Sequence, residues 1–140
     1  MKVSASDQAI VLVEGRLRAE VSLARIRRIV VLCREIMASV AEPDLGWVLE
    51  TTEADWFLPG DCALEGLLRG PLQQWLDESR CLYLATYVSA PLRLRALQAQ
   101  WALLRRRACA LPPGTSATLL AQADVEGPLS LEAAMHKVLG

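Results

Sequence analysis

Residues 56–76 read WFLPGDCALEGLLRGPLQQWL and contain the densest turn chemistry of a chain of 140 residues. The Pro-Gly dipeptide at 59–60 favours a turn, and Asp61 follows where its side chain could accept hydrogen bonds from the first amides of a helix. Gly70 would end this helix, and Pro71 would open another at a position where its missing N–H is tolerated. The stretch therefore predicts two short helices joined by a kink.

The two predicted helices share an apolar side, because leucine and tryptophan recur along them every three or four residues. The members of this stripe are Leu64, Leu67, Leu68, Leu72, Trp75 and Leu76. The bulky residues 56–58 precede the stripe and should pack under it rather than face water. We therefore expect the stretch to form part of the core, and it contains no diagnostic motif of function.

Three elements are predicted before this stretch. Residues 9–13 form an apolar run, 14–15 are turn-like and 16–21 alternate polar and apolar side chains, a pattern typical of a β-hairpin. Ser22 resembles an N-cap, and the apolar residues that follow recur at helical spacing, which predicts a helix over 22–40. Tryptophan, valine, leucine and threonine at 46–52 then favour a strand.

After the central stretch the pattern changes several times. Residues 81–88 are rich in aromatic and aliphatic side chains and predict a buried strand. Pro91 then opens a helix predicted over 91–110. Residues 111–116, LPPGTS, are typical of a loop. A last strand is predicted at 118–125, followed by a helix at 131–139 that is capped by the serine before it.

This order of elements predicts one domain over residues 1–140 with an α+β fold, in which a small antiparallel sheet is covered by helices on one face. The short apolar runs cannot be distinguished from buried helix segments by their periodicity. If the runs that begin at residues 9, 46, 81 and 118 are helical, the fold is an all-α bundle, which is the alternative.

The composition limits the class of protein. Apolar residues make up 53% of the chain and the mean hydropathy is +0.26, which argues against disorder. Charged residues interrupt every apolar run before the length of about 18 residues that a membrane span requires. The apolar run near the N-terminus is also too short for a secretion signal, so we expect an intracellular, cytoplasmic protein that does not bind a membrane.

The charges are sorted along the chain, although the net charge is only −1. Residues 16–34 contain six arginines and one acid, residues 42–65 contain seven acids and no basic residue, and residues 80–107 contain six arginines and no acid. Within one fold the acidic segment could pair with the arginine segments in surface ion pairs. Alternatively, the arginines could stay exposed and bind an acidic protein or a nucleic acid.

The helix predicted over 91–110 is apolar on two sides, which is typical of a helix that is central or shared with a partner. Together with the high apolarity and the sorted charge, this pattern favours a non-enzymatic interaction protein. It would act as an adaptor, a dedicated chaperone or an inhibitor that binds another protein, or it would form a homodimer. The predicted apolar anchors are Leu94, Leu97 and Trp101. The predicted charged rim consists of Arg105, Arg106 and Arg107.

Two other functions stay open. Glu53, Asp55 and Asp61 flank the bulky residues 56–58, and carboxylates beside apolar side chains can have raised pKa values suited to acid–base catalysis. A small enzyme with an acidic pocket is therefore the first alternative. Nucleic-acid binding through the arginine segments is the second, although a sequence pI near 5.8 argues against a dedicated nucleic-acid binder.

Other chemistry has little support in the sequence. The four cysteines form no CxxC pair and the chain contains one histidine, so these residues hardly supply a zinc site. Cys62 and His136 could form a nucleophile pair in space, but no local signature supports one. The common nucleotide-binding, acyl-transfer and zinc-protease motifs do not occur. We therefore expect no cofactor and no bound metal.

Overall fold

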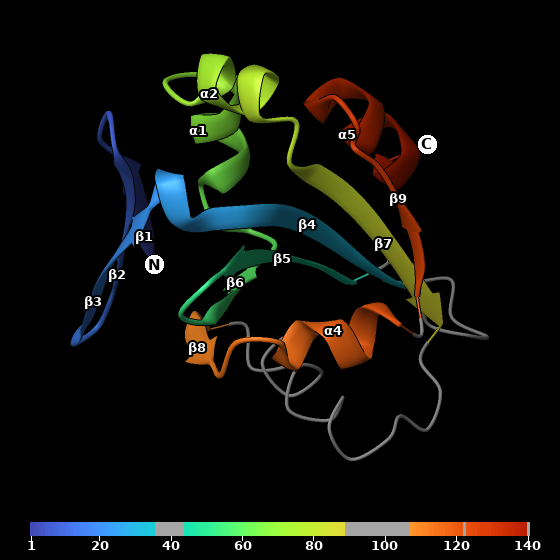
Figure 1. The fold of residues 1–140 in the computed structure, drawn as a ribbon, viewed down its shortest axis with the longest axis horizontal. Helices are drawn as coiled ribbons and strands as arrows, with labels where there is room; N and C mark the ends of the chain where they lie inside the picture. Colours follow the sequence, from blue (N-terminus) through green and yellow to red (C-terminus); the bar gives the residue numbers. More distant parts are fainter. Residues whose placement is uncertain (36–43, 89–106, 122, 140) are drawn as a thin grey trace.

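The computed structural model of this chain describes residues 1–35, 44–88, 107–121 and 123–139. Within these ranges it contains nine strands, arranged in two sheets, and four α-helices. Figure 1 shows a small N-terminal sheet beside a larger, twisted sheet that carries the helices. The expectation of an α+β fold is confirmed, and the alternative of an all-α bundle is wrong.

The N-terminal sheet is an antiparallel meander of β1 (Lys2–Ala5), β2 (Ala9–Glu14) and β3 (Leu17–Ser22). It contains the predicted hairpin, whose turn includes Gly15 at a positive φ of 58°. Side chains alternate across the sheet, so Ile10 and Leu12 of β2 share the face that packs on the core, where both are fully buried. The meander therefore covers one end of the main core (Figure 1).

The larger sheet has six strands in the order β8-β6-β5-β4-β7-β9. Their bounds are β4 (Ile26–Glu35), β5 (Asp44–Thr51), β6 (Asp55–Pro59), β7 (Leu82–Val88), β8 (Cys109–Leu111) and β9 (Asp124–Glu126). β4 and β7 are parallel, and the other neighbouring pairs are antiparallel. The strands predicted at 46–52 and 81–88 are confirmed as β5 and β7, but the sheet is mixed rather than small and antiparallel.

The helix predicted over residues 22–40 is wrong. A short 3-10 turn, η1 (Leu23–Arg25), leads into β4, which lies between β5 and β7 in the sheet. Residues 29–33 of β4 are all at most 6% exposed, because both faces of the strand are covered. A strand buried on both faces is apolar at every position, so its residues also satisfy helical spacing. Residues 36–40 lie outside the described residues.

The central stretch forms α1 (Leu64–Arg69) and α2 (Gln73–Ser79), which confirms two short helices with a break between them. No side chain caps the start of α1, so the capping role predicted for Asp61 is wrong. Residues 56–58 lie within β6, where Leu58 and Trp56 pack in the same core as the helices, as predicted, while Phe57 points into the other core. The predicted apolar stripe is confirmed for its four most buried members, Leu64, Leu68, Leu72 and Leu76.

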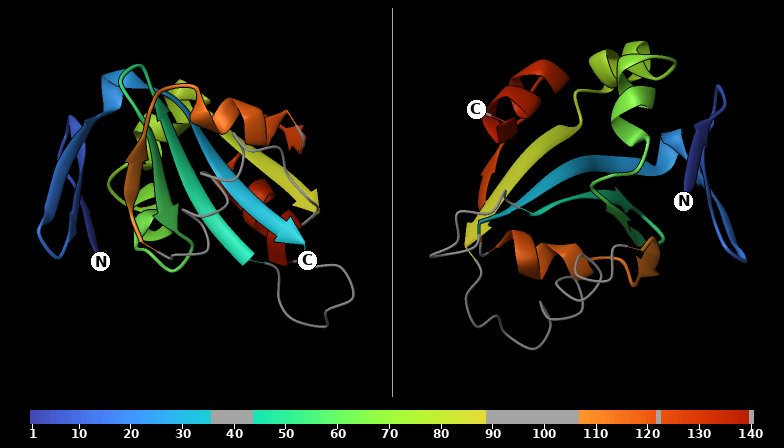
Figure 2. Two further views of the ribbon diagram at one scale, coloured as in Figure 1. Left: turned by 90° about the horizontal axis from the view of Figure 1, so that it is seen from below. Right: turned by 180° about the vertical axis from the view of Figure 1, so that it is seen from behind.

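Helices cover both faces of the larger sheet (Figures 1 and 2). α1, α2 and α5 (Leu131–Leu139) lie over one face, and α4 (Thr115–Leu120) lies over the other. Successive residues of β4 therefore belong to two cores: Ile29 and Val31 pack with α1 and α5, while Val30 and Leu32 pack with α4. The expectation that helices cover a single face is wrong.

The strand predicted at residues 118–125 is wrong over most of its length, because α4 extends to Leu120 and β9 begins only at Asp124. The residue before α4 is Gly114, with a positive φ of 85°. The carboxylate that accepts a hydrogen bond from the first turn of α4 belongs to Asp55, which is distant in the sequence. A local pattern cannot reveal a cap of this kind. The final helix predicted at 131–139 is confirmed as α5.

The two cores take up the apolar residues of the described part of the chain. Within it, the large apolar side chains that are exposed are those of Met1 and Val125, each 40% exposed. The high apolar content therefore does not produce an exposed apolar patch on the described surface. No helix of the described residues is long and apolar enough to cross a membrane.

Ser130 precedes α5, and its hydroxyl accepts a hydrogen bond from the Ala133 N–H at 3.1 Å, which confirms the predicted cap. Replacing Ser130 with alanine should lower the free energy of unfolding by about 1 kcal/mol, because this amide loses its partner. Ser130→Asp keeps an acceptor and should stay close to the parent protein. Urea unfolding followed by tryptophan fluorescence measures both variants, and equal losses would contradict a capping role.

Candidate functional site

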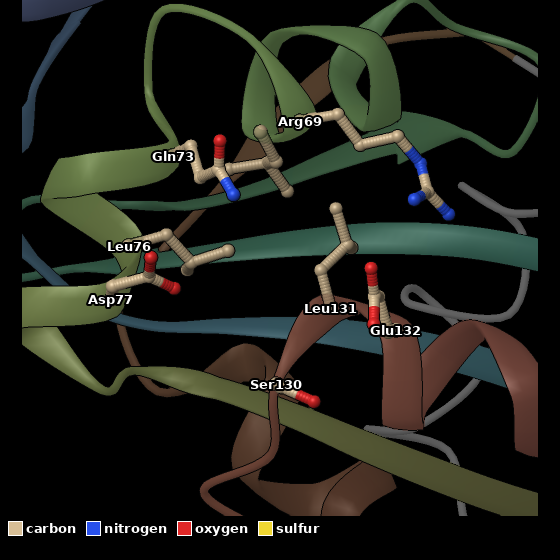
Figure 3. Close-up of a pocket in the computed structure, with 8 residues that line it drawn as sticks. Arg69, Gln73, Leu76, Asp77, Ser130, Leu131 and Glu132 are labelled. Atoms are coloured by element: carbon tan, nitrogen blue, oxygen red, sulfur yellow. The ribbon is translucent and has the colours of Figure 1, made fainter.

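A groove of about 410 Å³ lies between the α1–α2 pair and the start of α5 (Figure 3). Its base consists of three buried leucines, Leu68, Leu76 and Leu131. Exposed polar side chains surround this base: Arg69, Gln73, Asp77, Ser130 and Glu132. Proteins most often bind other molecules at concave surfaces where polar groups converge. We therefore take this groove as the candidate functional site.

One wall of the groove is the α1–α2 pair. Gln73 and Asp77 are four residues apart on α2, so successive turns present them on one side of that helix, and Arg69 joins this wall from the end of α1. The break between the helices is compact, because the Leu72 N–H donates to the Leu67 carbonyl at 2.9 Å. Figure 3 shows that the three polar side chains consequently line the same wall.

The opposite wall is the first turn of α5. The Leu129 N–H donates to the Leu82 carbonyl of β7 at 2.8 Å, which anchors the start of α5 to the sheet. The Ser130 hydroxyl is occupied by its hydrogen bond to the Ala133 N–H. Leu131 and Glu132 extend from this wall toward α1 and α2 in Figure 3. Both walls are therefore fixed by the fold itself.

The rim of the groove has an excess of negative charge. Arg69 donates from Nε and Nη2 to Oε1 of Glu65, at 3.2 and 3.0 Å, in an ion pair along α1. Asp77 and Glu132 have no ion-pair or hydrogen-bond partner among the described residues. The positive charge at the rim is thus compensated by a neighbour, whereas the two negative charges are not.

Gln73 adds an uncharged hydrogen-bonding group to the rim. Its side-chain amide has two donors and an acceptor, and none of them is used within the described residues. The adjacent Gln74 differs, because it donates to Glu78 at 3.0 Å and does not line the groove. The groove therefore offers an amide that a ligand can use without breaking an internal hydrogen bond.

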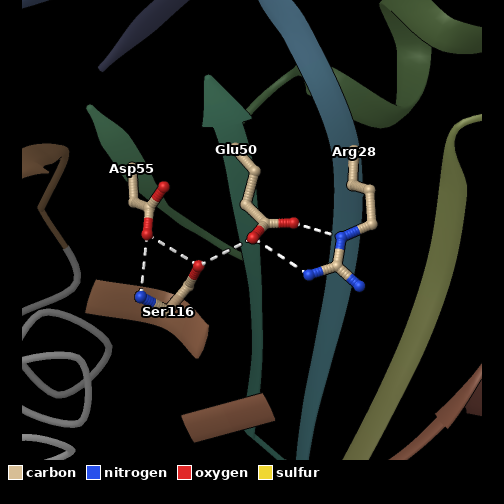
Figure 4. Close-up of polar contacts among 4 residues, drawn as sticks. All are labelled: Arg28, Glu50, Asp55 and Ser116. Atoms are coloured by element: carbon tan, nitrogen blue, oxygen red, sulfur yellow. Dashed lines mark hydrogen bonds and ion pairs between the residues drawn. The ribbon is translucent and has the colours of Figure 1, made fainter. Parts of the chain in front are cut away.

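A second polar cluster lies on the opposite face of the sheet (Figure 4). Asp55 of β6 accepts hydrogen bonds from the Ser116 N–H at 2.8 Å and from the Ser116 hydroxyl at 2.7 Å. The same hydroxyl lies 3.3 Å from Oε1 of Glu50, and Glu50 accepts two hydrogen bonds from the Arg28 guanidinium. These contacts extend from the start of α4 across β6 and β5 to β4.

This cluster is structural, because it holds α4 on the sheet. Asp55 is 1% exposed and Ser116 is fully buried, so neither side chain can meet a substrate from solvent. The Asp55 carboxylate lies at the start of α4, where the helix dipole also favours a negative charge. The hydrogen bond to Glu50 raises the pKa of Arg28, whose guanidinium lies 5.5 Å from the centre of the Tyr83 ring.

The three acids of the predicted pocket have different surroundings. Asp55 is buried against Ser116. Glu53 is exposed and forms an ion pair with Arg25, and Asp61 is exposed in the turn before α1. None of these acids lines the groove. The structure therefore gives no support to a shared acidic pocket, on which the enzymatic alternative depends.

Five of the six residues predicted to contact a partner lie outside the described residues: Leu94, Leu97, Trp101, Arg105 and Arg106. The sixth, Arg107, is exposed and lies just before β8. The predicted helix does not extend to residue 110, because Cys109 and Ala110 pair with β6. The partner-binding surface of this segment therefore stays a prediction.

Part of the first arginine segment is paired internally. Arg28 forms an ion pair with Glu50, and Arg25 forms one with Glu53. Both acids belong to the acidic segment, which the antiparallel pairing of β4 with β5 brings alongside the arginines. The interpretation of the sorted charge as internal ion pairs is confirmed for these two pairs, and this leaves less free positive charge for a nucleic acid.

The hypothesis of a Cys62 nucleophile is not supported. Burial raises the pKa of the Cys62 thiol, and the nearby Asp61 adds to the rise, while a hydrogen bond with the backbone of Leu64 opposes it. A thiol with a raised pKa is a poor nucleophile at neutral pH. His136 is exposed on α5. Across the described ranges, no group of three or more His, Cys, Asp or Glu residues is placed to hold a metal ion.

Gln73, Asp77 and Glu132 are not among the residues that the sequence predicts as a site. The only signal is the four-residue spacing of Arg69, Gln73 and Asp77, which is also the ordinary pattern of a solvated helix face. Glu132 joins them because α5 packs beside α2, although more than fifty residues separate the two segments. The groove could therefore be found only from the packing of the helices.

Comparison with known proteins does not indicate the function of this groove. No protein-family model, no curated protein and no solved structure matches the chain. The side chains at the groove, their partners and their charges are therefore the basis on which a function can be inferred.

Proposed function

We propose that this chain is a non-enzymatic, cytoplasmic interaction protein that holds a segment of another protein in the groove between α1–α2 and α5. An adaptor, a dedicated chaperone or an inhibitor could each use such a groove. One observation carries the proposal: three exposed side chains at the rim have hydrogen-bonding groups that no other described residue uses. They are Gln73, Asp77 and Glu132.

The composition of the groove suits a polypeptide segment better than a compact small molecule. Small-molecule sites are mostly apolar and enclose most of the ligand. Here the three leucines are at most 8% exposed, so the accessible lining is provided mainly by polar side chains. An extended segment brings its own N–H and C=O groups to such side chains and needs no deep apolar pocket.

The predicted surface of residues 91–107 is retained in the proposal as a second contact. Its apolar anchors would be Leu94, Leu97 and Trp101, and its charged rim would include Arg107, which is exposed. A partner that reaches both surfaces would gain affinity, because the second contact becomes intramolecular once the first has formed. If the partner is a second copy of the chain, the protein is a homodimer.

A photoreactive amino acid, p-benzoylphenylalanine, in place of Gln73 tests the proposal in cells of the native host. Irradiation should produce an adduct of one defined mass with another protein, because the reactive group would lie beside the bound segment. The matched control is the same replacement at Gln74, which is also exposed on α2 but lies outside the groove. The adduct should be strong at position 73 and weak at position 74.

Mass spectrometry of the adduct identifies the crosslinked peptide and thus distinguishes a second copy of the chain from a different protein. The proposal is contradicted if both positions give equal adducts, or if position 73 gives none while circular dichroism shows that the variant is folded. The same reactive group at position 107 tests the second contact. An adduct at 107 but not at 73 would assign partner binding to the other surface.

A further inference from the structure

The charge at the groove limits which segments it can hold. The guanidinium of Arg69 is paired with Glu65 at 3.0 Å, so its charge is already partly compensated. Asp77 on α2 and Glu132 on α5 are exposed, and neither has an ion-pair partner among the described residues. Figure 3 shows the two carboxylates on opposite walls. A positively charged ligand therefore complements this groove.

The leucine base narrows the choice of positive group. In Figure 3 the side chains of Leu76 and Leu131 lie between the two carboxylates. Lysine and arginine have alkyl stems that pack along apolar side chains while their charged ends stay in water or beside a carboxylate. A small inorganic cation would contact the carboxylates alone and would leave the space over the leucines unfilled. The groove thus suits a long, basic side chain.

Gln73 provides a contact for the backbone that carries such a side chain. It lies between Arg69 and Asp77 on the α1–α2 wall, and its amide has no partner among the described residues. A primary amide can accept from a backbone N–H and donate to a backbone C=O at the same time. An extended segment could therefore be held at its main chain as well as at its side chain.

We infer that the groove selects a segment with a lysine or arginine residue, whose stem lies over the leucine base and whose charged end approaches one of the two carboxylates, Asp77 or Glu132. This inference rests on the proposed function and adds to it the chemistry of the bound segment. Because both carboxylates are exposed, the attraction is screened by salt, and the affinity falls as the ionic strength rises.

Fluorescence anisotropy with labelled glycine–serine peptides tests the inference on the full chain. One peptide carries two arginines, a second carries two lysines and a third carries two glutamates. The basic peptides should bind at least about tenfold more tightly than the acidic peptide. The double variant Asp77→Asn/Glu132→Gln should bind the basic peptides about tenfold more weakly, because it retains the shape of the groove and loses both charges.

The control variant is Asp61→Asn/Asp124→Asn, which removes two exposed acids outside the groove and has the same net charge as the groove variant. It should bind the basic peptides like the parent protein. Equal weakening in the two double variants would show general attraction to a negative protein and would overturn the inference. Thermal unfolding by circular dichroism confirms that both variants are folded.

The results separate this inference from the proposed function. If position 73 crosslinks to a protein in cells but basic and acidic peptides bind equally, the interaction role stands and the basic-residue preference is wrong. If the basic peptides bind in the groove but no protein crosslinks there, the preference stands and the protein-partner role is wrong. Self-association that is abolished only by the groove variant would identify a second copy of this arginine-rich chain as the occupant.

Discussion

Replacing Asp55 with alanine should lower the free energy of unfolding by about 3–5 kcal/mol, the largest effect that we expect from a single substitution. The carboxylate is 1% exposed and accepts two hydrogen bonds from Ser116, at 2.7 and 2.8 Å. With alanine at position 55, the N–H and the hydroxyl of Ser116 would stay buried but would no longer have the carboxylate as their acceptor. It would also remove the negative charge at the start of α4. Glu50 contacts only the hydroxyl, at 3.3 Å, and cannot replace both bonds.

Four further variants isolate the cause of this loss. Asp55→Asn retains the shape and one acceptor, so its loss should be smaller, about 1–2 kcal/mol. Asp61→Ala removes an exposed acid and should change the stability by less than about 0.5 kcal/mol. The losses from Asp55→Ala and Ser116→Ala should not add in the double variant, because the two side chains share hydrogen bonds. Urea unfolding measures all five variants, and similar losses for Asp55→Ala and Asp61→Ala would refute the capping role.

Replacing Gly60 with alanine should lower the free energy of unfolding by about 3 kcal/mol. A Cβ atom at this position would lie 2.5 Å from the Leu45 carbonyl oxygen and 2.9 Å from the carbonyl carbon. Both are backbone atoms of β5, so the clash cannot be relieved by a side-chain rotation. Gly60 directly follows Pro59, which pairs with Gly46 of β5, and the added methyl group would force these strands apart.

Gly66 provides the matched control for this substitution. It is exposed within α1, and a Cβ atom there would meet no other atom within 4 Å. Gly66→Ala should raise the free energy of unfolding by about 0.5–1 kcal/mol, because alanine is the better helix former. The two glycine variants are thus expected to change stability in opposite directions. A thermal unfolding midpoint for Gly60→Ala at or above that of the parent protein would contradict the close approach of the two strands.

The sequence is a good guide to most features whose signal is local, although the local cap predicted for Asp61 is wrong. The hairpin turn at Gly15, the break between α1 and α2, and the Ser130 cap of α5 are each specified by residues within a few positions of the feature. Turn and cap preferences arise from the backbone angles and hydrogen bonds of those residues themselves. For that reason the predictions of these features are confirmed.

The sequence is a poor guide where an element depends on its neighbours. β4 satisfies helical spacing, and it is a strand because β5 and β7 pair with both of its edges and both of its faces are buried. α4 is predicted as the end of a loop and the start of a strand, but it is helical in the structure, where Asp55 accepts hydrogen bonds from its first turn. Such partners come from distant segments, and no local window contains them.

By itself, the sequence determined a large apolar content, two short helices at the centre and a sorted pattern of charge, and it favoured a mixed fold over an all-α bundle. Only the tertiary structure decided which side chains became buried and which became accessible to a ligand. Asp55 became a cap because β6 and α4 meet, and Asp77 and Glu132 came to face one groove because α2 and α5 pack side by side. The physical reason is that burial and charge pairing depend on distances in space, whereas periodicity records only distances along the chain.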